Sequence, residues 1–125
     1  MVAILNLLVV CGQNKKRSRT AESIYKNDSR LSIRSAGLSP QSRRKLSRDD
    51  LSWASLVLVM ESKHKKKIRE LFGRNFSTMD SLEIPDEYEY LDPALIELLK
   101  SKIEPYLTKE NDHGNQEEDT SKEDR

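Results

Sequence analysis

The sequence predicts an α/β fold, a three-layer sandwich in which helices cover both faces of a central, roughly four-stranded parallel sheet. Apolar, β-branched runs at Val2–Val10 and Ser55–Met60 are typical of strands that are buried on both faces. Helix-like stretches separate the strands, and this alternation favours parallel pairing through right-handed crossovers. A chain of 125 residues suits one domain of this kind.

Local signals predict the remaining elements. Leu31–Ala36 alternates and stops at Gly37, which indicates a strand. Ser47 and Asp50 have the spacing of a capping box at the start of a helix. Asp92-Pro93 is typical of an N-cap followed by a first helical turn. In chain order we expect a helix at Thr20–Asn27, a strand at Leu31–Ala36, helices after Ser47 and after Ser62, a weaker strand at Met79–Ile84, and a last helix after Asp92-Pro93.

Charge is distributed unevenly along the chain. Residues 1–80 contain 17 Lys and Arg against 7 Asp and Glu, whereas residues 81–125 contain 5 against 14. Residues 108–125 have no apolar side chain that could anchor them to a core. We therefore expect a folded domain over residues 1–107 and an acidic, disordered tail over residues 108–125.

The composition also indicates the cellular compartment in which the protein is expected. The single cysteine cannot form an intramolecular disulfide, and no stretch approaches the length of a membrane helix. The apolar start "MVAILNLLVVC" lacks the basic residues that begin an export signal. We therefore expect a cytoplasmic monomer that does not associate with membranes.

The stretch "VVCGQNKKRSRTAE" places Cys11 at the end of the first strand and Arg17 six residues later. Ligands of open α/β sheets bind at the carboxyl ends of strands, beside helix N-termini. Backbone N–H groups of such a turn converge on an anion, and their field also stabilises a thiolate. The planar guanidinium of Arg17 can bind two oxygens of a phosphate group. Phosphate chemistry with a cysteine nucleophile is thus indicated.

This stretch resembles the phosphate-binding loop of the low-molecular-weight protein tyrosine phosphatase family. The family's Cys-x-x-Asn-x-x-Arg-Ser pattern falls on Cys11, Asn14, Arg17 and Ser18, with Ala-Glu following. The later segments "RSAGL", "LVLVME" and "IPDEYEY" resemble, in the same order, the family's segment after its second strand, its third strand and its acid loop. The resemblance implies metal-independent phosphomonoester hydrolysis through a cysteinyl-phosphate intermediate, with no cofactor and with an activity like that of a protein tyrosine phosphatase.

The resemblance also implies roles for individual residues. Cys11 would be the nucleophile, Arg17 would bind the phosphate, and Asp86 would act as general acid and then as general base. Asn14, Ser18 and Ser35 would support the loop, and Lys15 and Tyr88 would line the substrate crevice. The phosphate-binding loop as a whole would comprise Gly12, Gln13, Asn14, Lys15, Lys16, Arg17 and Ser18, which inorganic phosphate or sulfate is expected to occupy.

Departures from the family pattern leave the substrate open. Lys16 stands where a second loop cysteine is usual, Glu87 replaces a proline, and the segment between Gly37 and Leu46 is short, with the family's histidine mapping to Gln41. A phosphotyrosine protein, a small phosphomonoester such as a nucleotide, and an RNA end all remain candidates, as does a phosphate-binding module without turnover.

Two further assignments stay open at this point. Asp92 is the alternative general acid, although helix capping is the commoner reason for an aspartate before proline. The run "SKHKKK" around His64 is interpreted as a solvated helix face. Such a basic face could attract a polyanion, but it lacks aromatic residues for base stacking, so nucleic acid is the less favoured partner.

Overall fold

The structure, a computed structural model, describes residues 4–74, 76 and 78–111, with side chains described as far as residue 107. Four strands alternate with four helices in the described part of the chain. In order they are β1 (Leu5–Cys11), α1 (Arg17–Tyr25), β2 (Leu31–Gly37), α2 (Arg48–Trp53), β3 (Leu56–Val59), α3 (Ser62–Phe72), β4 (Thr78–Ser81) and α4 (Pro93–Asn111).

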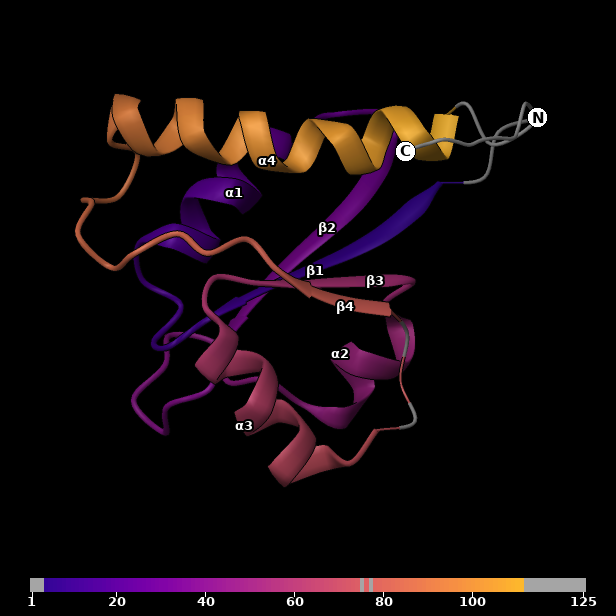
Figure 1. Ribbon diagram of the computed structural model, residues 1–125, viewed down its shortest axis with the longest axis vertical. Coiled ribbons are helices and arrows are strands. Elements are labelled where there is room, and N and C mark those ends of the chain that lie inside the picture. The colour runs from indigo at the N-terminus through magenta and orange to yellow at the C-terminus, as the bar shows by residue number, and fades with distance from the viewer. Residues whose placement is uncertain (1–3, 75, 77, 112–125) are drawn as a thin grey trace.

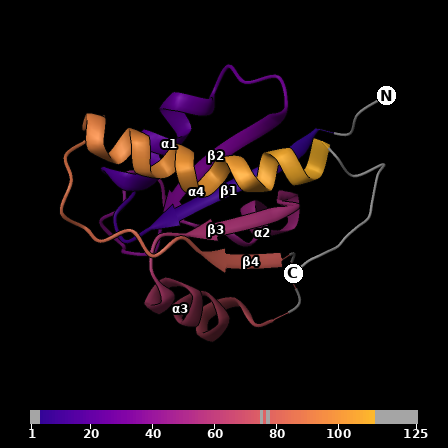
Figure 2. The ribbon, with the colours of Figure 1, turned by 45° about the horizontal axis from the view of Figure 1, so that its top comes forward.

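The four strands form one parallel sheet in the order β2-β1-β3-β4. Helices α1 and α4 lie on one side of the sheet and α2 and α3 on the other (Figures 1 and 2). The predicted three-layer α/β class is therefore confirmed. No helix among residues 4–111, with positions 75 and 77 set aside, is both long enough and apolar enough to cross a bilayer.

Alternating side chains of the central strands fill two separate cores. Along β1, Leu7 and Val9 belong to the core beneath α1 and α4, whereas Leu8 and Val10 belong to the core beneath α2 and α3. All four side chains are fully buried. Successive side chains of a strand point to opposite faces of the sheet. Because helices cover both faces here, all four of these residues are apolar.

Several element boundaries differ from the expected ones. Helix α1 begins three residues before Thr20, because the polar residues of its first turn give no apolar periodicity. Ser62 is the first residue of α3 rather than its cap, and Glu61 is the N-cap. Helix α4 continues to Asn111, four residues beyond the expected end of the domain. The rest of the expected tail, residues 112–125, lies outside the described residues, and its disorder stays a prediction.

The strand order creates a switch point at the carboxyl end of β1, since the chain crosses from β1 to β2 on one side and reaches β3 on the other. Cys11 ends β1 there and pairs with Gly37, the last residue of β2. A Cβ atom at Gly37 would lie 2.8 Å from the backbone N of Asn14 and would also meet Ser42 Oγ. Only glycine therefore lets β2 and the following turn approach the residues after Cys11.

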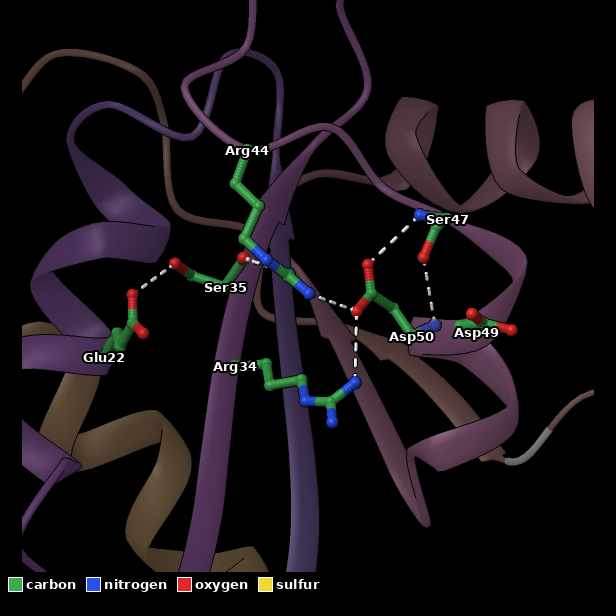
Figure 3. Close-up of a pocket in the computed structure, with 7 residues that line it drawn as sticks. All are labelled: Glu22, Arg34, Ser35, Arg44, Ser47, Asp49 and Asp50. Carbon is green, nitrogen blue, oxygen red and sulfur yellow. Dashed lines mark hydrogen bonds and ion pairs between the residues drawn. The ribbon is translucent and has the colours of Figure 1, made fainter.

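Asp50 connects α2 to this region. Its side chain is 1% exposed and accepts hydrogen bonds from Arg44 Nη2 at 2.5 Å and from the backbone N–H of Ser47 at 3.1 Å (Figure 3). Ser47 Oγ in turn accepts from the N–H of Asp50, so the predicted capping box is present. Arg34 approaches the same carboxylate, and Arg44 also donates to the carbonyl oxygen of Ser35.

Replacing Asp50 by asparagine is expected to lower the free energy of unfolding by about 2 kcal/mol, because two arginines lose their buried anionic partner. The mutation Asp49→Asn is the matched control, since Asp49 is exposed in the same helical turn. That control should stay within about 0.5 kcal/mol of the parent. Urea denaturation monitored by circular dichroism measures both. Equal effects of the two variants would show that Asp50 contributes only surface charge.

Candidate active site

A cavity of about 330 Å³ opens at the carboxyl end of β1. Its lining comes from three parts of the chain: the end of β1, the following loop with the start of α1, and the segment after β4. The residues that line it are Cys11, Gly12, Gln13, Lys15, Lys16, Arg17 and Asp86. The structure thus brings the sulfur of Cys11, the guanidinium of Arg17 and the carboxylate of Asp86 to one cavity.

The loop between β1 and α1 leaves backbone donors free. Among the described residues, none accepts a hydrogen bond from the backbone N–H groups of positions 13–16. Asn14 has a φ of 54°, a left-handed conformation that asparagine adopts more readily than most residues. Unpaired N–H groups beside a helix N-terminus favour binding of an anion such as phosphate.

A chain of hydrogen bonds supports this loop from below. Cys11 Sγ lies 3.0 Å from Ser18 Oγ, and Asn14 Nδ2 lies 2.9 Å from both Ser18 Oγ and Ser35 Oγ. Ser35 Oγ donates to Glu22 Oε1 at 2.5 Å (Figure 3). Asn14, Ser18 and Ser35 are almost fully buried. The three residues expected to support the loop are therefore linked to one another through Asn14 and to the sulfur through Ser18.

The donors and acceptors present set the direction of most of this chain. The hydroxyl of Ser35 donates its hydrogen to Glu22 Oε1. Ser35 Oγ must then accept from the amide nitrogen of Asn14, which also donates to Ser18. Either atom can donate between Ser18 Oγ and Cys11 Sγ, and when Cys11 is a thiolate the donor is the hydroxyl of Ser18. A hydroxyl that donates to sulfur stabilises its thiolate form.

Arg17 is held by residues that follow β3 and β4. Its side chain is 4% exposed, and Nη1 donates to Glu61 Oε2 at 2.6 Å and to the carbonyl oxygen of Ile84 at 2.7 Å. The hydrogen bond from Arg17 keeps the pKa of Glu61 below its usual range, against the opposing effect of burial. Sequence reasoning missed Glu61, although its place directly after a buried strand, at the same edge of the sheet as Cys11, was a usable signal.

Asp86 and Asp92, the two candidates for the general acid, lie in different environments. Asp86 lines the cavity with a largely exposed carboxylate, and its Oδ1 is 3.7 Å from Arg17 Nε. Asp92 Oδ1 instead accepts a hydrogen bond from the N–H of Ala94 at the start of α4, and Asp92 does not line the cavity. The geometry favours Asp86 and explains Asp92 as a helix cap.

The two tyrosines after Asp86 are directed elsewhere. Tyr88 is half-buried and packs against the core beneath α1 and α4, so it is not among the residues that line the cavity. Tyr90 lies under the guanidinium of Arg19, 4.5 Å from it, and shares a 2.7 Å hydrogen bond with Ser23. Both tyrosines therefore fasten this segment to the body of the domain. A crevice function for Tyr88 stays a prediction.

His64 is buried, which corrects its interpretation as part of a solvated helix face. The side chain is 4% exposed, and Nδ1 accepts a hydrogen bond from the backbone N–H of Glu61 at 3.1 Å. A Cβ atom built on Gly12 would lie 4.0 Å from His64 Nε2, so the ring adjoins the phosphate loop. The neighbouring lysines concealed this buried position, because their polarity hides the helical spacing of His64 and Ile68.

This burial predicts a pH dependence of stability. Burial, with a smaller contribution from the charge of Arg17, lowers the pKa of His64 below its usual value of 6.5. The unfolded chain then binds a proton where the folded chain does not, so the free energy of unfolding falls as the pH drops below about 6.5. His64→Asn, which keeps an acceptor for Glu61, should flatten this slope between pH 7 and 5, while Lys67→Asn should preserve it. Urea denaturation across this range measures the effect, and an unchanged slope in His64→Asn would contradict it.

Comparisons with known proteins extend this description. No family model matches the sequence, and no curated protein matches it. Solved structures do match. The YwlE arginine phosphatase from Geobacillus stearothermophilus has a TM-score of 0.68 and 21% identity, covering 90% of this chain and 99% of its own. The tyrosine phosphatase Wzb from Escherichia coli, in complex with phosphate, has a TM-score of 0.67 and 20% identity, covering 86% and 99%.

A third solved structure bears directly on the predicted resemblance. The low molecular weight protein tyrosine phosphatase SP-PTP from Streptococcus pyogenes has a TM-score of 0.72 and 15% identity, with 85% of this chain and 93% of that chain covered. The similarity spans nearly all of the described elements, whereas the identity in each case is low. The chain therefore has the fold of the low molecular weight protein tyrosine phosphatases, as its ordered motifs predicted.

Proposed function

We propose that this protein is a cysteine-dependent phosphatase, which hydrolyses phosphomonoesters through a cysteinyl-phosphate intermediate. The observation that carries the proposal is the single cavity lined by Cys11, Arg17 and Asp86. These side chains supply a nucleophile, a cation that binds the phosphate oxygens, and a proton donor. The tyrosine phosphatases among the structural neighbours support an activity like that of a protein tyrosine phosphatase.

In the first step the thiolate of Cys11 attacks phosphorus, and the sulfur–phosphorus bond forms as the ester bond breaks. The free N–H groups of the loop and the guanidinium of Arg17 bind the equatorial oxygens. Because Glu61 and the Ile84 carbonyl already orient Arg17, little reorganisation is needed during the reaction. Asp86 transfers its proton to the leaving oxygen, so the product departs as a neutral alcohol or phenol.

In the second step water breaks the sulfur–phosphorus bond. The carboxylate of Asp86, now unprotonated, accepts a proton from the water as its oxygen attacks phosphorus. Inorganic phosphate leaves, and the Cys11 thiolate is again stabilised by the hydroxyl of Ser18. The same loop donors bind the phosphoryl group in both steps, so the chemistry requires only residues of this chain.

The direct test is hydrolysis of p-nitrophenyl phosphate by the purified protein, measured with and without a metal chelator. Turnover that the chelator does not change, together with competitive inhibition by inorganic phosphate, is the expected result. Binding of phosphate without any turnover would instead favour a phosphate-binding module. Loss of activity with the chelator, restored by a divalent metal, would contradict the proposed chemistry.

A further inference from the structure

We infer that the substrate is a phosphomonoester whose leaving group carries a second anionic group, which Lys15 binds at the cavity mouth. This inference rests on the proposed phosphatase function and concerns the part of the substrate that does not react. It rests on two observations. One cation that lines the cavity has no ion-pair partner among the described residues, and none of the residues that line the cavity is aromatic.

Three cations line the cavity, and two of them are already engaged. Arg17 binds Glu61 and faces the position of the transferred phosphate. Lys16 Nζ lies 3.5 Å from Glu89 Oε2. The ammonium group of Lys15 is exposed and forms no ion pair with any residue in the described ranges. Lys15 is thus the cation that a substrate group can bind without displacing a protein carboxylate.

The remaining lining is polar rather than aromatic. None of the seven residues that line the cavity is aromatic. Tyr88 packs against the core, and Tyr90 is held between Arg19 and Ser23, so moving either ring into the cavity would break existing contacts. A flat aromatic leaving group would therefore gain little stacking here, whereas a hydrophilic group with its own negative charge would pair with Lys15.

The short turn between Gly37 and Leu46 contacts the phosphate-binding loop. The backbone N–H of Arg43 donates to the carbonyl oxygen of Gln13, which fixes residues 38–45 against the phosphate loop. Arg43, whose backbone makes this contact, is exposed, whereas the carboxylate of Asp86 lines the cavity and Glu89 pairs with Lys16. An anionic leaving group is attracted to the unpaired Lys15 and repelled by the carboxylate of Asp86.

The test compares matched substrates that differ in charge. Phenyl phosphate, 4-carboxyphenyl phosphate and 4-(aminomethyl)phenyl phosphate have neutral, anionic and cationic leaving groups. The value of kcat/KM should be highest for the anionic ester, about threefold or more above the neutral one at low ionic strength, and lowest for the cationic ester. Added salt should reduce these differences.

Two variants assign the effect to Lys15. In Lys15→Gln the preference for the carboxylated ester over phenyl phosphate should fall to about onefold. Lys26→Gln removes an exposed lysine at the far end of α1 and should keep the parental preference. If Lys15→Gln lowers both rates equally, Lys15 acts on the transferred phosphate and the inference is overturned. Equal values of kcat/KM for the three esters in the parent would also overturn the inference, but the phosphatase function would stand. If no ester is hydrolysed at all, the phosphatase function itself is contradicted.

Discussion

Cys11→Ser is expected to abolish hydrolysis of p-nitrophenyl phosphate, with a loss of about 10⁴-fold or more, because the nucleophile of the first step is removed. The serine hydroxyl can still accept from Ser18, and the loop donors do not change. Phosphate binding and the urea denaturation midpoint should therefore stay close to those of the parent. Steady-state kinetics measure the loss, and isothermal titration calorimetry with inorganic phosphate measures the binding.

A second readout reports the intermediate itself. Rapid quenching of the parent protein during turnover should yield the peptide that contains Cys11 with the added mass of one phosphoryl group. The Cys11→Ser protein should not accumulate that adduct. Residual turnover near the parental rate in Cys11→Ser would exclude the covalent route, whatever the binding experiment shows.

Asp86→Asn is expected to lower kcat by about 10²–10⁴-fold, because an amide cannot protonate the leaving oxygen. The loss should grow as the leaving group becomes more basic, so alkyl phosphates should suffer more than p-nitrophenyl phosphate. The limb of the pH–rate profile that reports the protonated acid should also disappear. Kinetics over a series of aryl and alkyl esters measure both effects.

Asp92→Asn is the matched control, because asparagine is also a good N-cap and keeps an oxygen for the N–H of Ala94. This variant should retain kcat within about twofold and show no dependence on the leaving group. If Asp92→Asn shows the steep dependence and Asp86→Asn does not, the general acid has been assigned to the wrong aspartate.

The sequence predicted the fold because its strongest signals are local. The buried strands β1 and β3 are short apolar runs, and the segments between the strands alternate with them as helices, a pattern that favours a parallel sheet. The loop residues from Cys11 to Ser18 are likewise contiguous, so their spacing alone indicated a phosphate site. The cavity places Cys11 and Arg17 together, as that spacing suggested.

What the sequence did not predict depends on contacts between distant segments. Glu61 binds Arg17 across 44 positions of the chain, and no periodic pattern links two such residues. His64 lies in a run of lysines, and only the packing of α3 against the end of β1 shows that one of these polar residues is buried. The positions of Tyr88 and Tyr90 follow from core packing and from Arg19, neither of which a loop sequence reveals.

The hydrogen-bond chain beneath the loop lets a residue outside the cavity influence the Cys11 thiol. Glu22, a partly exposed residue of α1 that faces β2, connects to the sulfur through Ser35, Asn14 and Ser18. In Glu22→Gln, the amide can donate to Ser35 as well as accept from it, so each hydrogen bond of the chain can change direction. None of the residues that line the cavity is changed by this substitution. The reactivity of the thiol is thus open to adjustment, by design or during evolution, through a residue outside the lining of the cavity.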